Sequence, residues 1–172
     1  MQHYKNLYKQ LDKDRGFRLA DQGHITYPPL SKVMVDLFVH ILKNKRNKNN
    51  KISNVYDPCC GYGMLLSEFK QTYTNEFESK KLKFFCQDIN ADVIEYVQKE
   101  NPDWETFSED SLVSERYKNR KFDYLIFNPP FGGRSRISKI DSNLQFLLKS
   151  LDHLDENSII MSAQPANVCY SV

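Results

Sequence analysis

The chain has 172 residues, a formal net charge of +2 and a hydrophobic fraction of 40%. This length fits one domain with a single core, and the nearly balanced charge excludes binding to nucleic acid through overall basicity alone. The four cysteines show no CxxC or Cys/His spacing, so we expect reduced thiols, no metal and no disulfide framework. Neither an apolar signal segment nor a run of membrane-spanning length occurs, so we expect a cytoplasmic protein without a membrane partner.

The first fifty residues predict an N-terminal helical segment. Apolar side chains recur at helical spacing over residues 4–11, and Gly16 is expected to end that helix. A loop over 21–29 leads into a longer helix whose apolar face runs from Leu30 to Ile41. The run 43–51 is rich in Lys, Arg and Asn, which is typical of a solvated helix end and linker, with nucleic-acid contact as the alternative.

From residue 52 the pattern alternates between strands and helices. Strands are expected at 52–56, 83–87, 104–107, 122–127 and 158–162, and helices from about 64, at 91–100 and at 144–154. The last helix is expected to turn an apolar stripe inward, at positions 144, 147, 148, 151 and 154. This alternation predicts an α/β fold with a doubly wound, mostly parallel sheet over 51–172, and ligands of such sheets lie beyond the carboxyl ends of the strands.

The most informative stretch is 121–133, KFDYLIFNPPFGG. Its apolar run predicts a buried strand that must stop at Asn128, because Pro129 and Pro130 lack amide hydrogens. The stiff loop offers the amide oxygen of Asn128, the carbonyl of Pro129 and the ring of Phe131. These groups suit a flat heterocycle with an exocyclic amino group, although a proline-terminated strand followed by a plain turn has the same sequence.

The turn 57–63, DPCCGYG, follows the first strand and opens a helix. Glycines at 61 and 63 let a ligand approach the backbone closely. A dinucleotide fingerprint would need a third glycine where Leu66 stands, and the carboxylate of Asp57 would repel a pyrophosphate. A cationic or amino-bearing ligand is therefore favoured, and no phosphate-cradling GxxxxGK[ST] motif occurs.

Two further acidic positions follow the second and third strands. Asp88 stands where such folds hold the ribose of an adenosine-type cofactor, and capping of the next helix by Asp88 or Asn90 is the alternative. After the third strand, an acidic side chain of Glu109 or Asp110 can accept from an adenine amino group, and a plain turn is the alternative there.

As a set, these motifs resemble the S-adenosylmethionine-dependent adenine-N6 DNA methyltransferases, most closely the modification subunits of type I restriction systems. Residues 23–37 resemble the leading cofactor motif of that family, although Tyr27 stands where the family usually has threonine. The resemblance implies a Rossmann-like methyltransferase core with S-adenosyl-L-methionine as cofactor. It implies cofactor contacts at these residues: Tyr27, Asp57, Pro58, Gly61, Gly63, Asp88, Ile89, Asp110, Ser111 and Leu112.

The same resemblance makes the tetrapeptide Asn128, Pro129, Pro130 and Phe131 the catalytic motif. If Asn128 and the Pro129 carbonyl accept the hydrogens of the target amino group, its nitrogen lone pair is free to attack the methyl group. No histidine is needed as a base. A target adenine in duplex DNA would have to be flipped out and stacked on Phe131. Arg134, Arg136 and Lys139 lie in an adjacent basic loop that either contacts phosphates or is simply solvated.

Partners and completeness are expectations of the same kind. Relatives in that family continue past the fifth strand, so 51–172 is expected to be a fragment, a minimal core or a decayed, inactive form, without a separate target-recognition domain. Recognition would then come from a specificity subunit. If the strand order is that of the family, the fifth strand, 158–162, lies outside the fourth, and its edge carries no charge or proline. We therefore expect the chain to self-associate through this edge, to recruit a partner there, or to cover the edge with its own tail over 164–172. Two other functions stay open: methylation of RNA or of a protein glutamine, and a non-catalytic binding or assembly protein.

Overall fold

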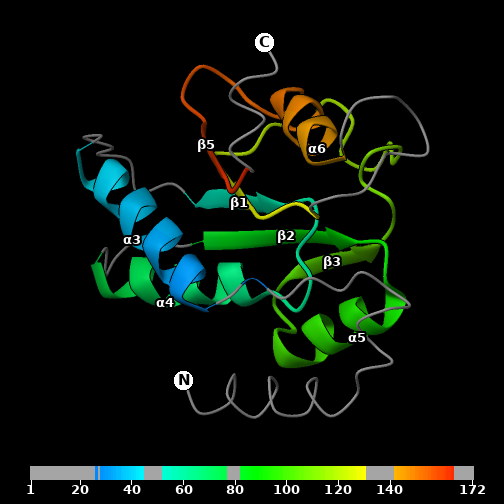
Figure 1. Ribbon diagram of the computed structural model, residues 1–172, viewed down its shortest axis with the longest axis horizontal. Coiled ribbons are helices and arrows are strands. Elements are labelled where there is room, and N and C mark those ends of the chain that lie inside the picture. The colour runs from blue at the N-terminus through cyan, green and yellow to red at the C-terminus, as the bar shows by residue number, and fades with distance from the viewer. Residues whose placement is uncertain (1–25, 27, 45–51, 77–81, 131–141, 165–172) are drawn as a thin grey trace.

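The computed structural model describes residues 26, 28–44, 52–76, 82–130 and 142–164 (Figure 1). Its elements in chain order are α3 (Pro28–Asn44), β1 (Ser53–Asp57), α4 (Met64–Glu76), β2 (Leu82–Asp88), α5 (Ala91–Glu100), β3 (Glu105–Ser108), β4 (Tyr124–Phe127), α6 (Ser142–Leu151) and β5 (Ile159–Ser162). The alternation expected from residue 52 is confirmed. The helix expected over 4–11 lies outside the described residues.

The five strands form one sheet in the order β3-β2-β1-β4-β5, and all neighbouring pairs are parallel. The chain runs outward from β1 through β2 to β3 and then crosses back to place β4 on the other side of β1. The doubly wound parallel sheet is therefore confirmed. The reversal of strand order falls between β1 and β4, where open α/β sheets hold their ligands.

Apolar side chains cover both faces of the sheet because consecutive strand residues point to opposite sides. Val55, Phe84 and Tyr124 join the larger core cluster, to which α3, α4 and α5 contribute Phe38, Phe69 and Val97 among others. The smaller cluster on the other face contains Tyr56, Phe85, Tyr117, Phe122 and Leu125. In Figure 1, α4 and α5 lie on one side of the strands and α6 on the other.

The strand β4 begins two residues later than the sequence suggests. The amide of Phe122 donates to the carbonyl of His153 at 3.0 Å, so it is bonded to the segment after α6 and not to β1. At the next position the Asp123 side chain accepts from the amide of Asn54 at 2.8 Å, and its backbone carbonyl accepts from the amide of Ile159 in β5 at 3.0 Å. His153 itself is buried against the rings of Tyr56 and Phe122.

The helix α6 differs from expectation in the face that it turns inward. Its buried residues are Asn143 and Ser150, whereas Leu148 and Leu151 are 46% and 50% exposed. The expected stripe was therefore wrong at positions 148 and 151. The buried polar groups are satisfied locally, since Asn143 donates to the Gln164 side chain at 3.2 Å and Ser150 to the carbonyl of Phe146 at 2.7 Å.

The last strand, β5, pairs with β4 from Tyr124↔Ile159 to Phe127↔Ser162. Within the described residues, no strand pairs with its other side. Its position outside β4 is the expected one. A tail over 164–172 was one expected cover for this edge, and all of that tail except Gln164 lies outside the described residues.

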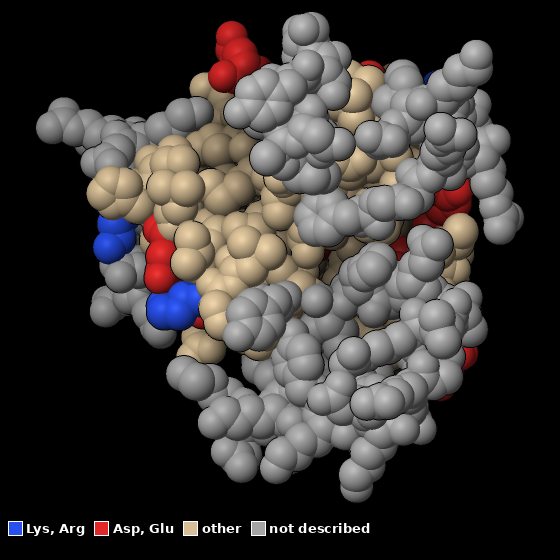
Figure 2. Space-filling model, viewed as in Figure 1, with Lys and Arg blue, Asp and Glu red and all other residues tan. Residues whose placement is uncertain are grey.

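No helix in the described part of the chain is long and apolar enough to cross a membrane. On the side shown in Figure 2, the described surface carries acidic and basic side chains singly and not as one basic patch. The basic loop with Arg134, Arg136 and Lys139 lies outside the described residues.

Candidate cofactor and active site

The predicted site residues that the structure describes lie at one edge of the sheet. Asp57 ends β1, Asp88 ends β2, Asp110 follows β3 and Asn128 follows β4. Because parallel strands end together, these four positions line a single edge across four adjacent strands. Tyr27 and Phe131 lie outside the described residues.

The first part of the site is the turn that carries Asp57, Pro58, Gly61 and Gly63. Gly61 and Gly63 have φ of +50° and +71°, a left-handed conformation that favours glycine. The Asp57 carboxylate accepts from the amide of Cys59 at 3.0 Å, and the amide of Cys60 donates to the carbonyl of Gln87 at 2.9 Å. The turn is thus tied to the ends of both β1 and β2.

Asp57 is buried, with 2% of its surface exposed. The pKa of this carboxyl is raised to about 8, chiefly by burial; the hydrogen bond from the Cys59 amide opposes the rise, and the nearby Asp88 adds to it. Within the described residues it forms no ion pair. A buried carboxyl with a raised pKa and no ion-pair partner is suited to bind a cationic group of a ligand, because the cation would stabilise its ionised form.

Asp88 links the second strand to the glycine turn. Its two oxygens accept from the amide of Gly61 at 2.9 Å and from the amide of Asn90 at 3.0 Å. Burial raises the pKa of Asp88, and these backbone hydrogen bonds oppose the rise. The cap of α5 is Asn90, whose side chain accepts from Asp92 and Val93, so Asp88 is not the cap. Beside it, Ile89 presents a side chain that is 70% exposed.

After β3 the chain folds into a tight turn that begins at Asp110. The Asp110 carboxylate accepts from the amide of Leu112 at 3.0 Å. The buried hydroxyl of Ser111 donates to the carbonyl of Pro58 at 2.7 Å, which joins this turn to the glycine turn. The side-chain oxygens of Glu109 are taken by Ser114 and Arg116. Of the two acidic candidates, Asp110 is therefore the one whose carboxylate can still accept a hydrogen bond from a ligand.

The loop after β4 holds Asn128, Pro129 and Pro130. Asn128 donates from Nδ2 to the hydroxyl of Thr26 at 3.3 Å, which fixes the orientation of the amide. Its Oδ1 is buried and has no hydrogen-bond partner among the described residues. The Pro129 side chain is buried, and the Pro130 carbonyl accepts from Ser142 at 3.3 Å, so not every carbonyl of this loop is open.

Sequence reasoning did not single out Thr26. The leading motif was expected to carry its threonine at position 27, where this chain has tyrosine, and the structure instead brings the neighbouring Thr26 against Asn128. Gln87 was also missed, although it directly precedes Asp88 and its buried amide is bonded to three other side chains. A buried polar residue inside an apolar strand, FFCQD, is the signal that was available.

The three described cysteines, Cys59, Cys60 and Cys86, are free thiols. Burial and the neighbouring acids raise the pKa of Cys59, and a hydrogen bond with Cys86 does so for Cys60. Both shifts favour the protonated thiol. In the described part of the chain, no group of three His, Cys, Asp or Glu side chains is arranged to hold a metal ion.

A model of the N-6 DNA methylase family matches residues 21–158, and the chain belongs to that family. Among solved structures, the chain is similar to the methyltransferase subunit of a type I restriction-modification system from Streptococcus thermophilus, with 19% identity and a TM-score of 0.67 over 84% of this chain and 34% of that one. Comparison with curated protein sequences gives no match.

Two further similar structures are the type IIG restriction endonuclease BpuSI and the plantazolicin methyltransferase BpumL in complex with S-adenosylhomocysteine. The first has a TM-score of 0.61 at 16% identity, over 81% of this chain and 19% of BpuSI. The second has a TM-score of 0.58 at 16% identity, over 78% of this chain and 47% of BpumL. The chain spans less than half the length of these three structures, and at such identities the likeness concerns the fold.

Proposed function

We propose that this chain is the cofactor-binding and catalytic core of a methyltransferase that transfers the methyl group of S-adenosylmethionine to the N6 amino group of adenine in DNA. The observation that carries the proposal is the buried Oδ1 of Asn128, which has no hydrogen-bond partner among the described residues. An unsatisfied buried acceptor is costly unless a ligand group completes it. Membership of the N-6 DNA methylase family gives the amino group of adenine as that ligand.

The residues at the sheet edge fit the cofactor. Asp57 offers a buried carboxyl to the ammonium group of the methionine part, and Gly61 and Gly63 allow close approach to the backbone. Asp88 is assigned to the ribose, and Ile89 offers an exposed apolar surface to a face of the adenine ring. Asp110, with the adjoining Ser111 and Leu112, is assigned to the adenine edge, and Tyr27 remains a proposed contact. The BpumL complex with S-adenosylhomocysteine supports this choice of cofactor.

When bound, the cofactor supplies a methyl group on a positively charged sulfur. The part of this chain in the reaction is to hold the acceptor. Thr26 fixes the Asn128 amide, so Oδ1 accepts one hydrogen of the target amino group and the Pro129 carbonyl accepts the other. With both hydrogens of the amino group held, the nitrogen lone pair would be free of the ring, and a bound cofactor would supply the methyl group that the nitrogen accepts.

The proposed substrate is a flipped adenine, because an adenine inside a duplex cannot reach Asn128. Phe131 is assigned as the stacking residue, and Arg134, Arg136 and Lys139 as phosphate contacts. Sequence reading is assigned to a separate specificity subunit or to another segment, as the likeness to a type I methyltransferase subunit suggests. A restriction-modification role implies action in the cytoplasm.

The test is methyl transfer from labelled S-adenosylmethionine to DNA, RNA and protein, with the wild-type chain and with Asn128→Ala. We expect transfer to adenine in DNA, a loss of at least about 100-fold in turnover for Asn128→Ala, and binding of S-adenosylhomocysteine within about threefold of wild type. Asn157→Ala, at an exposed asparagine outside the site, is the control and should keep full turnover.

Near-normal turnover in Asn128→Ala would contradict the role of that amide. Transfer to RNA or to a glutamine side chain, with none to DNA, would redirect the substrate while leaving the cofactor site in place. A wild-type chain that binds neither S-adenosylmethionine nor S-adenosylhomocysteine would be a non-catalytic member of the family.

A further inference from the structure

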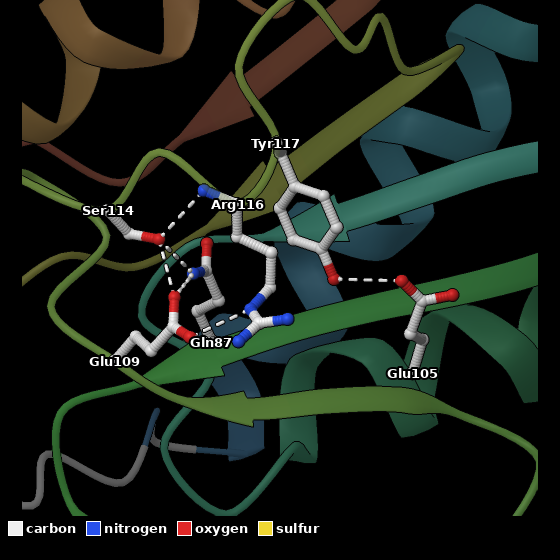
Figure 3. A network of polar contacts seen from close by, with 6 residues as sticks. All are labelled: Gln87, Glu105, Glu109, Ser114, Arg116 and Tyr117. Carbon is white, nitrogen blue, oxygen red and sulfur yellow. Dashed lines mark hydrogen bonds and ion pairs between the residues drawn. The ribbon is translucent and has the colours of Figure 1, made fainter.

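A series of hydrogen-bonded polar side chains lies beside the proposed cofactor residues. Its members are Tyr56, Gln87, Glu109, Ser114 and Arg116, and Figure 3 shows the last four together. Tyr56, Gln87 and Glu109 each directly precede a proposed cofactor residue, namely Asp57, Asp88 and Asp110. Because side chains alternate along a strand, Tyr56 and Gln87 point to the face opposite Asp57 and Asp88. We call Gln87, Glu109, Ser114 and Arg116 the polar network.

The centre of the polar network is Gln87, which is only 2% exposed. Its Oε1 accepts from the hydroxyl of Tyr56. Its Nε2 donates to Ser114 Oγ at 3.3 Å and to Glu109 Oε2 at 3.5 Å. A buried amide is costly unless both of its ends are bonded, so these bonds fix the distance between β2 and the segment after β3.

Glu109 is held from both sides. Ser114 donates to its Oε2 at 2.5 Å and Arg116 Nε donates to its Oε1 at 2.8 Å. The hydrogen bond from Arg116, followed by that from Ser114, lowers the pKa of Glu109, so the carboxylate stays ionised. The Arg116 guanidinium in turn lies 3.7 Å from the centre of the Phe107 ring, which limits its movement.

The polar network closes the turn that carries Asp110. The amides of Val113 and Ser114 donate to the carbonyl of Asp110 at 3.2 and 2.9 Å, so Ser114 holds this turn through its backbone as well as its side chain. An open hollow of about 560 Å³ lies against the same turn and is lined by Glu109, Asp110, Val113, Ser114, Glu115 and Arg116. Side-chain contacts of this network therefore set where the Asp110 carboxylate stands at the rim of that hollow.

We propose that Gln87, Glu109, Ser114 and Arg116 are positioning residues that hold the turn 110–114 so that the Asp110 carboxylate meets the amino group of the cofactor's adenine. This rests on the proposed function, which assigns Asp110 to the adenine edge. None of the four needs to touch the amino group itself. A network that only stabilised the fold would affect all ligands alike, whereas a positioning network affects recognition of one chemical group.

The test measures how strongly the protein distinguishes an amino group on the purine. Calorimetry gives the Kd of S-adenosylhomocysteine and of its 6-oxo analogue, which has a carbonyl oxygen in place of the amino group. The ratio of the two Kd values is the amino preference. We expect a preference of at least about tenfold for the wild-type chain, because a hydrogen bond to a carboxylate contributes that much, and a preference near one for Asp110→Ala.

Arg116→Ala and Gln87→Met test the polar network, with circular dichroism to confirm folding. We expect the amino preference to fall below about threefold in both, while the Kd of the 6-oxo analogue stays within about threefold of wild type. Arg116→Lys keeps a cation beside Glu109 and should retain part of the preference. If Gln87→Met does not fold, Arg116→Ala still decides the matter, because Arg116 is exposed.

Lys118→Ala is the matched control. Lys118 lies in the same segment and forms an exposed ion pair with Glu115 at 2.5 Å, away from Gln87 and Glu109, so the amino preference should be unchanged. A preference lost in Asp110→Ala but kept in Arg116→Ala and Gln87→Met would overturn the positioning role and leave the proposed function intact. Equal weakening of both ligands would also overturn it. A wild-type chain that binds neither ligand would end the proposed function, and the positioning role with it.

Discussion

At the scale of single residues, Asp57 is a candidate site residue whose burial lowers the stability of the ligand-free protein at higher pH. This carboxyl is buried at the end of β1, and burial raises its pKa from an ordinary 3.8 to about 8. In the unfolded chain it ionises near pH 4. Between these values the folded state holds a proton that the unfolded state has released, so the free energy of unfolding falls as the pH rises from about 4 to about 8.

We therefore predict that Asp57→Asn stabilises the free protein by more than about 1 kcal/mol at pH 8, since a change of one in a pKa corresponds to about 1.4 kcal/mol. The asparagine oxygen can still accept from Cys59, so the turn is kept. Urea denaturation at pH 5 and pH 8 checks this. The gain should be smaller at pH 5, and Asp103→Asn, at an exposed aspartate, should show no such difference. An Asp57→Asn variant less stable than wild type at pH 8 would contradict the burial argument.

Several site residues were predictable from their chemistry, and others were not. Asp57, Asp88, Asp110 and Asn128 stood out because polar residues at strand ends break an apolar pattern. Thr26 and Gln87 did not, because their importance comes from contacts between segments far apart in the chain, such as the 102 residues that separate Thr26 from Asn128. Spacing along the sequence carries no sign of such a contact.

At the scale of elements, the start of α4 depends on Gly63. The amide of Ser67 donates to the Gly63 carbonyl at 2.9 Å, so this glycine begins the helix. Its φ is +71°, and an added Cβ would lie 3.1 Å from Cζ3 of Trp104. Both the backbone conformation and the neighbouring ring therefore favour glycine here.

We predict that Gly63→Ala lowers the free energy of unfolding by about 1–2 kcal/mol, the usual cost of a left-handed conformation for a residue with a Cβ. It should also weaken binding of S-adenosylhomocysteine. Urea denaturation and calorimetry measure the two effects. Gln71→Ala, at an exposed position of α4, is the control and should stay within about 0.5 kcal/mol of wild type. A Gly63→Ala protein as stable as wild type would show that the turn can relax.

The positions of the helices and strands were predicted from the sequence more accurately than the way in which they pack. α5 is at 91–100 as expected, because Asn90 supplies a recognisable cap and the apolar spacing is regular. β4 starts late because the amide of Phe122 is bonded to His153 and the Asn54 amide is bonded to the Asp123 side chain, and α6 turns Asn143 inward because Gln164 accepts a hydrogen bond from it. Both departures depend on partners from another part of the chain, which local patterns do not contain.

At the scale of the whole molecule, β5 leaves an edge of the sheet that is neither charged nor interrupted by proline. The amides of Ile159 and Ala163 donate toward β4 at 3.0 and 3.2 Å. Since alternate amides of a strand face opposite sides, those of Ile160 and Ser162 face away from β4. All four residues of β5 are only partly buried.

We predict that this edge is covered in solution, because unpaired strand edges recruit partners. Amide exchange should show protection at Ile160 and Ser162, and light scattering over a concentration series shows whether a second copy supplies it. Protection that rises with concentration indicates self-association, and protection in a monomer indicates cover by the chain itself. The amides of the central strand β2 serve as the protected reference. A monomer with rapidly exchanging amides at Ile160 and Ser162 would contradict the prediction.

From the strand order we expect the two halves of the candidate site to form at different times during folding. β1, β2 and β3 are neighbours in the sheet and follow each other in the chain, whereas β4 joins β1 through contacts such as Asn54 with Asp123, 69 residues apart. Contacts distant in sequence form late because the loop between them must first close. Asp57, Asp88 and Asp110 belong to the early half, and Asn128 arrives with the late one. A newly made chain would thus acquire the residues proposed to hold a methyl donor before it acquires the residue proposed to use it.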